Sequence, residues 1–243
     1  MKIKTIKTLA FFGAKEYFYS KFSYLVFFFA LLLVYVSILV GIMAVSEEKK
    51  VLMDFFLSIT QISLLIFCIL SISASVQNDM ETKRIYLILS RPVKSSEYIL
   101  GKIFGVCLAS LLLLVFISLI CGIVLILKGY FFDAKYLLSL LLVYLKVSLI
   151  SAVCALFVSL TTSAFTSIAI TIMIWFLGHF MSELKYALNK AGGVKILFKW
   201  LVYLFPDFSY SIDKISWSYV FYLIIYIFVI SAISAFAFKN KEF

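Results

Sequence analysis

The sequence predicts an all-α polytopic membrane protein with six transmembrane helices, an N-terminal interfacial helix and both termini in the cytoplasm. Of its 243 residues, 65% are hydrophobic and 14% are charged, and the mean hydropathy is +1.14. Soluble domains are about 45–50% apolar, and a water-soluble fold of this length could not bury so much apolar surface. The apolar residues are spread along the whole chain. This excludes a soluble domain with a single membrane anchor.

Six stretches are long and apolar enough, or nearly so, to cross a bilayer. A spanning helix needs about 20 apolar residues at about 1.5 Å each. The stretches are 22–45, 53–76, 103–127, 136–160, 164–181 and 216–238. With six spans both termini share a side, and that side carries twelve lysine and arginine residues against nine on the other. Because cytoplasmic loops carry the excess of basic residues, this count places both termini in the cytoplasm.

Residues 1–21 form a separate basic segment before the six-helix domain of residues 22–243. Apolar or small residues recur there with helical spacing, at Ile3, Ile6, Ala10, Gly13 and Tyr17, and four lysines lie elsewhere around the helix. Such a pattern is typical of a helix that lies on an anionic membrane surface. We therefore expect an interfacial helix over 1–21, with a flexible basic tail as the alternative.

The cytoplasmic segment 77–102 predicts a helix, a bend and a second helix. Glu81–Ser90 carries charged residues first and apolar residues afterwards, and Pro92 disfavours helical geometry in the residue before it. Ser95 or Ser96 can cap a second helix, with Glu97 near the positive end of its dipole.

The first of these helices has too many apolar residues for its length. Leu87, Ile88 and Leu89 cannot all face lipid or the bundle from so short an element. Some of them should contact a partner protein or the membrane surface. An ordinary interfacial loop is the alternative.

This segment resembles the cytoplasmic signature of type-2 ABC transporter permeases. In that family an acidic residue is followed by an apolar pair, Pro-Val, a Ser/Arg pair, Glu-Tyr and Leu-Gly-Lys. The matching positions are Glu81, Leu89, Pro92, Val93, Glu97, Tyr98, Gly101 and Lys102. Further matches are Ala14-Lys15-Glu16, Ser20-Lys21-Phe22, Ser159–Ser167 and Leu204–Phe208. The similarity covers nearly the whole chain and is closest to small six-span permeases, such as those of nitrous oxide reductase maturation. The chain departs from the family at Arg84-Ile85, where Gly-Thr is frequent.

The resemblance implies a permease subunit of an ATP-driven transporter, and an exporter rather than an importer. Residues 82–91 would form a coupling helix that sits in a groove of a separate ATP-binding subunit. Two permease subunits, identical or related, would pair in the cytoplasmic membrane, and ATP and Mg²⁺ would be bound by the partner. The residues implied in coupling are Glu81, Thr82, Lys83, Arg84, Ile85, Leu87, Ile88, Leu89, Arg91 and Pro92.

The chain itself offers no enzyme site. It contains no G-x-x-x-x-G-K-[ST] phosphate loop and no G-x-S-x-G motif. His179 is its one histidine, and its four cysteines lie inside apolar runs without metal-ligand spacing. We therefore expect no catalytic residue, no metal, no cofactor and no nucleic-acid partner. The alternatives to a permease are an ATP-independent channel or secondary carrier and a force-transmitting scaffold subunit.

Lys146 lies near the middle of the fourth predicted span, about ten residues or 15 Å from its start. Inserting a lysine at that depth costs about 2.5–3.5 kcal/mol. Lys146 is therefore a candidate contact for an anionic substrate group. The alternative is that its ammonium reaches the interface or binds backbone carbonyls or hydroxyls.

Two further features concern helix packing. Gly101 and Gly105 form a G-x-x-x-G at the start of the third span, which allows a close helix contact. In the outer segment 183–215, Gly192-Gly193 breaks the chain before the run 194–205. That run is too short to span and predicts an interfacial or re-entrant helix, with a simple aromatic anchor as the alternative.

Overall fold

The computed structural model describes residues 3–43, 48–89, 93–130, 134–161, 163–190, 205–208 and 217–240. All regular secondary structure in these residues is α-helical. The helices are α1 (Ile3–Phe18), α2 (Lys21–Met43), α3 (Glu48–Glu81), α4 (Arg84–Leu89), α5 (Ser95–Leu127), α6 (Ala134–Leu160), α7 (Ala164–His179), α8 (Met181–Lys190) and α10 (Trp217–Lys239).

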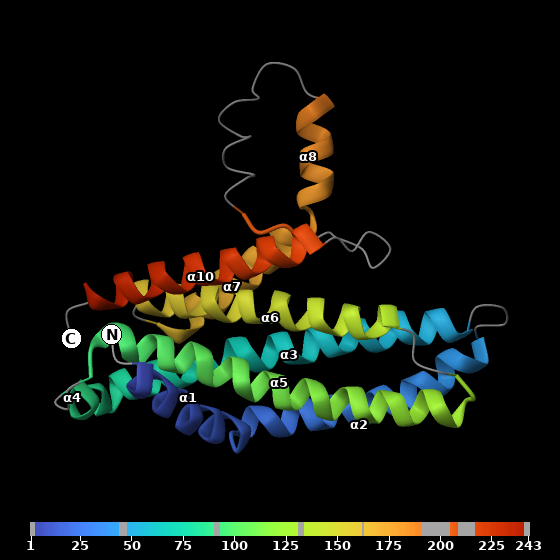
Figure 1. Cartoon of the computed structure of the whole chain (residues 1–243), viewed down its shortest axis with the longest axis horizontal. Coiled ribbons are helices and arrows are strands. Elements are labelled where there is room, and N and C mark those ends of the chain that lie inside the picture. The colour runs from blue at the N-terminus through green and yellow to red at the C-terminus, as the bar shows by residue number, and fades with distance from the viewer. Residues whose placement is uncertain are drawn as a thin grey trace.

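The long helices run side by side along one axis (Figure 1). Helices α3, α5 and α6 form the centre, α2 lies on one side, and α7 and α10 lie on the other. Helix α4, the start of α1 and the end of α10 lie at the same end of the bundle, which we call the α4 end (Figure 1). Helix α8 projects from the side of the bundle.

Four helices in the described residues are long and apolar enough to cross a membrane: α3, α5, α6 and α10. The number becomes five if α1 and α2, which meet at a bend of 57°, are counted as one span. Helix α7 has 16 residues, or about 24 Å, and is shorter than a typical span. Each predicted span lies mostly on a helix, and α3 extends beyond its predicted span at both ends. The count of six spans remains a prediction.

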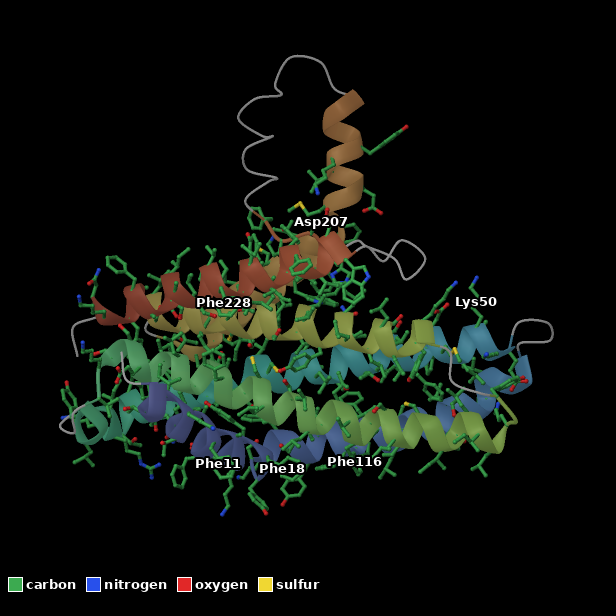
Figure 2. The ribbon with its side chains drawn as sticks, in the orientation of Figure 1. Phe11, Phe18, Lys50, Phe116, Asp207 and Phe228 are labelled. Carbon is green, nitrogen blue, oxygen red and sulfur yellow. The ribbon has the colours of Figure 1, made fainter. Side chains whose placement is uncertain are left out.

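The outer surface of the bundle is apolar. Phe116 of α5 and Phe228 of α10 project outward from the bundle (Figure 2), and Leu119, Ile123 and Phe221 are also exposed. Lipid tails solvate such side chains, and a helix satisfies its own backbone hydrogen bonds in the absence of water. These faces agree with the membrane location that the composition predicts.

Helix α1 is oriented differently from the prediction. The stripe that predicted contact with the membrane surface packs against α5 instead, with Ile6, Ala10 and Tyr17 all buried. Phe11 points away from the bundle (Figure 2). Phe11 and Phe12 are 69% and 66% exposed. The small side chains allow α1 to lie closely on α5, so burial against protein replaces burial in the membrane surface.

A polar contact joins two helix ends at the end of the bundle opposite α4. Glu48, the first residue of α3, pairs with Lys128 just after α5 at 2.6 Å. Tyr130 donates a hydrogen bond to the same carboxylate at 3.1 Å, and this bond raises the pKa of the tyrosine above its ordinary value. The contact ties the start of α3 to the end of α5.

Candidate functional site

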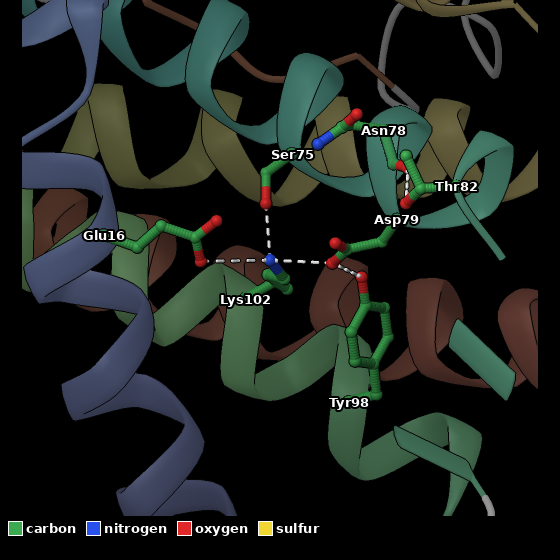
Figure 3. Close-up of polar contacts among 7 residues, drawn as sticks. All are labelled: Glu16, Ser75, Asn78, Asp79, Thr82, Tyr98 and Lys102. Carbon is green, nitrogen blue, oxygen red and sulfur yellow. Dashed lines mark hydrogen bonds and ion pairs between the residues drawn. The ribbon is translucent and has the colours of Figure 1, made fainter. Parts of the chain in front are cut away.

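The α4 end contains a tight link between α3 and α4. The backbone N–H of Thr82 donates to the carbonyl of Asn78 at 2.9 Å, and its hydroxyl donates to the same oxygen at 2.6 Å (Figure 3). Lys83 follows with a φ of 56°, in the left-handed region where helices commonly end. Its N–H donates to the carbonyl of Met80 at 3.2 Å. Two residues with defined hydrogen bonds therefore connect the helices, so α4 cannot move far without the end of α3.

Helix α4 has one buried and one exposed side. Ile85 is buried, whereas Tyr86 is 49% and Leu87 is 71% exposed. Arg84 is also exposed and lines a cleft beside α1. One apolar side chain thus anchors α4 to the bundle, and Leu87 of the same helix is mostly exposed.

The predicted coupling residues fall on three elements. Glu81 is the last residue of α3, Thr82 and Lys83 form the link, and Arg84 begins α4. The predicted helix over 82–91 is therefore shorter, with bounds Arg84–Leu89. The side chains of Ile88 and Leu89, together with Arg91 and Pro92, lie outside the residues whose positions are described.

The start of α5 differs in detail from its prediction. Neither predicted serine is the N-cap; Lys94 is, and its backbone N–H donates to the carboxylate of Glu97 at 3.5 Å. Ser96 instead donates to the carbonyl of Ala235 on α10 at 3.2 Å. The prediction of a serine cap was wrong because the carboxylate of Glu97, one turn later, reaches back to the helix start.

A mostly buried polar cluster lies next to the link and joins three helices (Figure 3). The ammonium of Lys102 on α5 lies 3.0 Å from Asp79 and 2.5 Å from the Ser75 hydroxyl, both on α3. It also lies 3.6 Å from Glu16 on α1. Tyr98, one turn before Lys102, donates to Asp79 at 2.6 Å. We call these five residues the Lys102 cluster.

Burial makes this cluster energetically important. The side chains of Lys102 and Asp79 are only 11% and 8% exposed, whereas Glu16 is 59% exposed. The ammonium also lies 5.7 Å from the ring centres of Tyr17 and Tyr98. Removing one member of a buried ion pair typically costs about 3–5 kcal/mol, because the other charge is left without a partner. The cluster therefore holds α3 and α5 in a fixed relation.

Helix α1 approaches the same part of α5 very closely. A Cβ atom added to Gly105 would lie 3.2 Å from Ala10 O and from Ala14 N, which are backbone atoms of α1. One added to Gly101 would lie 2.7 Å from the Cβ of Leu9. The predicted small-residue pair thus lies at a helix contact, and the helix it contacts is α1.

A cleft of about 350 Å³ opens between these elements. Its lining includes Phe12 and Gly13 of α1, Arg84 of α4 and, from the Lys102 cluster, Asp79 and Lys102. Exposed Arg84 of α4 and members of the Lys102 cluster therefore line the same cleft. Of the predicted coupling residues, Arg84 is the one that lines it.

Sequence reasoning missed the ion pairs of Lys102 with Asp79 and Glu16. Tyr98 and Lys102 belong to the matched signature and lie four residues apart, on one face of a helix. That spacing could have indicated a shared partner. Asp79 lies on a different helix, and the sequence around it does not indicate that it is this shared partner.

Lys146 lies away from this cluster. Its ammonium donates to the backbone carbonyl of Phe208 at 2.8 Å, and it makes no ion pair with any described residue. The contact matches the backbone-carbonyl alternative, and the substrate role remains a prediction. His179 packs near the same segment, with its ring 5.7 Å from that of Phe208.

Comparison with known proteins identifies the family. Residues 15–182, more than half of the chain, match the family model described as ABC-2 family transporter protein. The chain belongs to the ABC-2 transporter family. No match to a curated protein was found. As an ABC-2 family member, the chain is a membrane permease component of an ABC transporter rather than its ATPase.

The matched region of the ABC-2 protein includes most of the α4 end. It covers Glu16, the whole of α3, α4 and α5, and therefore all of the Lys102 cluster. It ends at residue 182, before the segment 205–208 and α10. ABC-2 permeases normally work with an ATP-binding subunit, and the α4 end of this chain presents exposed Leu87 and exposed Arg84 on one short helix.

Proposed function

We propose that this chain is the membrane subunit of an ATP-driven exporter, and that α4 is the element that docks with a separate ATP-binding subunit. The observation that carries the proposal is the combination of exposed Tyr86 and Leu87 with a rigid two-residue link to α3. Tyr86 and Leu87 lie close to exposed Arg84 in the sequence, and exposed apolar groups beside polar ones are typical of a protein–protein contact. A groove in the ATP-binding subunit supplies the partner surface.

The Lys102 cluster would transmit a displacement of α4, caused by docking, to other helices of the bundle. A displacement of α4 acts on the last turn of α3, where Asp79 lies four residues before Lys83. Asp79 binds Lys102 and Tyr98, so the displacement reaches α5, and Glu16 extends the contact to α1. Two states of the ATP-binding subunit would thereby favour two arrangements of the bundle.

Further parts of the proposal rest on the resemblance to type-2 permeases. ATP and Mg²⁺ would be bound by the partner, two permease subunits would pair, and the complex would lie in the cytoplasmic membrane. The likeness to permeases of nitrous oxide reductase maturation belongs to the same resemblance. The positions of the start of α1, the end of α10 and α4 at one end of the bundle support termini on the side of the ATP-binding subunit (Figure 1).

Docking is tested with Leu87→Asp. The tagged permease is purified from native membranes in mild detergent, and the co-eluting ATP-binding protein is quantified by mass spectrometry. A charged group in place of Leu87, which is 71% exposed, should reduce recovery of the partner by about tenfold or more, the equivalent of about 1.4 kcal/mol.

The matched control is Leu127→Asp, because Leu127 is also an exposed leucine, at 81%, but lies at the far end of α5. That variant should retain the partner. If the permease elutes without an ATP-binding protein in several gentle detergents, or if both variants behave like the unchanged chain, docking through α4 is wrong.

A further inference from the structure

An apolar groove lies away from α4 and from the Lys102 cluster. It has a volume of about 400 Å³ and lies between α6, α7 and α10. Its lining is almost entirely hydrocarbon and includes Phe157, Ile170, Ile174, Tyr226 and Ile230. Binding pockets for small molecules usually range from about 300 to 1,000 Å³, so the groove has room for a ligand.

A four-residue segment closes one end of this groove. Phe205 and Pro206 line it, and Asp207 and Phe208 follow directly. We call residues 205–208 the strap. The strap is non-helical, and such backbone is tolerated at membrane depth only where protein groups satisfy it.

Three helices supply those groups. Lys146 of α6 donates to the carbonyl of Phe208 at 2.8 Å, and the N–H of Phe208 donates to Gly178 of α7 at 2.9 Å. Tyr219 of α10 donates to the carbonyl of Asp207 at 2.6 Å. The Phe208 ring packs on Gly178 so closely that no larger residue would fit there. The strap is therefore a fixed end wall of the groove.

The wall carries an excess of positive charge. Lys185 of α8 forms an ion pair with Asp207, and its side chain is still 40% exposed. Lys146 binds the strap from the other side without a carboxylate of its own among the described residues. One carboxylate thus stands against two ammonium groups at the end of an apolar groove. This arrangement is complementary to an amphiphile with an apolar tail and an anionic head.

We propose that the groove binds one acyl chain of an anionic membrane lipid, with the lipid headgroup at Lys185. The groove lies between apolar helices of a membrane protein, where hydrocarbon is the surrounding solvent and water finds no polar partners. The basic groups at its end select a negatively charged headgroup over a zwitterionic one. This site requires no ATP-binding partner, so its test is independent of the proposed function.

The test uses photoreactive phospholipids that carry a diazirine on one acyl chain. The purified permease is irradiated with the phosphatidylglycerol form or the phosphatidylcholine form, and labelled peptides are identified by mass spectrometry. Phosphatidylglycerol should label α7 and α10 at the groove. Ile174→Trp together with Ile230→Trp should fill the groove and remove most of that labelling.

Matched controls separate the groove from ordinary lipid contact. Phe228→Trp enlarges α10 on its exposed face and should leave groove labelling unchanged (Figure 2). Lys185→Gln should lower the preference for phosphatidylglycerol several-fold, because it removes one of the two ammonium groups that contact the strap, and Lys185→Arg should retain it. Labelling of α2 at exposed Phe28 gives the level that surrounding lipid alone produces in each variant.

Three results would overturn the proposal. Labelling spread evenly over all exposed faces would mean surrounding lipid only. Equal labelling by both lipids, or no effect of the tryptophan pair, would contradict an anionic lipid in the groove.

Discussion

Lys83 is the residue on which the position of α4 depends most directly. Its φ of 56° is unfavourable for a side chain with a Cβ atom, by about 1 kcal/mol or more, and glycine has no such penalty. The side chain is exposed, so replacing it removes little packing. Lys83→Gly should therefore keep the link and stabilise it by about 0.5–1 kcal/mol. The measurement is the thermal unfolding temperature in detergent, with recovery of the ATP-binding partner as a second readout.

Lys83→Val is the matched variant, because a β-branched side chain tolerates the left-handed region least. It should lower the unfolding temperature and reduce recovery of the partner. Equal behaviour of the glycine and valine variants would show that the link does not hold α4 through this conformation.

Single residues also show where sequence reasoning reached its limit. The polarity of Lys146 marked it as unusual, but its partner is a backbone carbonyl 62 residues away. Asp79 and Lys102 are each ordinary in their local sequence, and only the packing of α3 on α5 makes them a buried pair. Hydropathy and motif spacing carry no information on such long-range contacts.

At the scale of helices, the apolar run lengths predicted the centres of α2, α3, α5, α6 and α10 well. The ends of the apolar runs were less accurate, since α3 continues to Glu81, five residues beyond its predicted span. The second helix predicted in the segment 77–102 is the beginning of α5, which starts at Ser95. Hydropathy marks the hydrocarbon layer, whereas a helix continues until capping or a turn residue ends it. The amphipathic stripe of α1 was predicted correctly, but it packs against α5 rather than against the membrane surface.

The contact of α1 with α5 yields a prediction at this scale. Gly105 faces backbone atoms of α1 at 3.2–3.3 Å, and backbone cannot rotate away as a side chain can. Gly105→Leu should push α1 off α5 at a cost of about 1–3 kcal/mol, the usual range for overpacking. The variant should show a lower unfolding temperature and faster hydrogen exchange in α1. Leu112→Phe, an enlargement on the exposed face of α5, should change neither, and an unaltered α1 in the glycine variant would contradict the contact.

The whole molecule combines α4, which we propose as the docking element, with the Lys102 cluster and the helix bundle. The charges of the cluster can be removed while α4 and the apolar core are left unchanged. Replacing Lys102 alone would leave the buried carboxylate of Asp79 unpaired and destabilise the fold. The double variant Asp79→Leu with Lys102→Met removes both charges and is far less costly. It should still co-purify with the ATP-binding subunit, because Tyr86 and Leu87 are unchanged.

Hydrogen exchange of the complex, measured with and without ATP, distinguishes docking from transmission. In the unchanged permease, ATP should alter exchange in α4, at the end of α3 and in the first turns of α5. In the double variant the change should remain in α4 and disappear from α5, since the cluster that joins α3 to α5 is absent. Lys50→Met, at an exposed lysine of α3 (Figure 2), should leave the whole response intact. An undiminished response of α5 in the double variant would mean that motion passes through the apolar packing of α3 on α5, and that the Lys102 cluster only stabilises the fold.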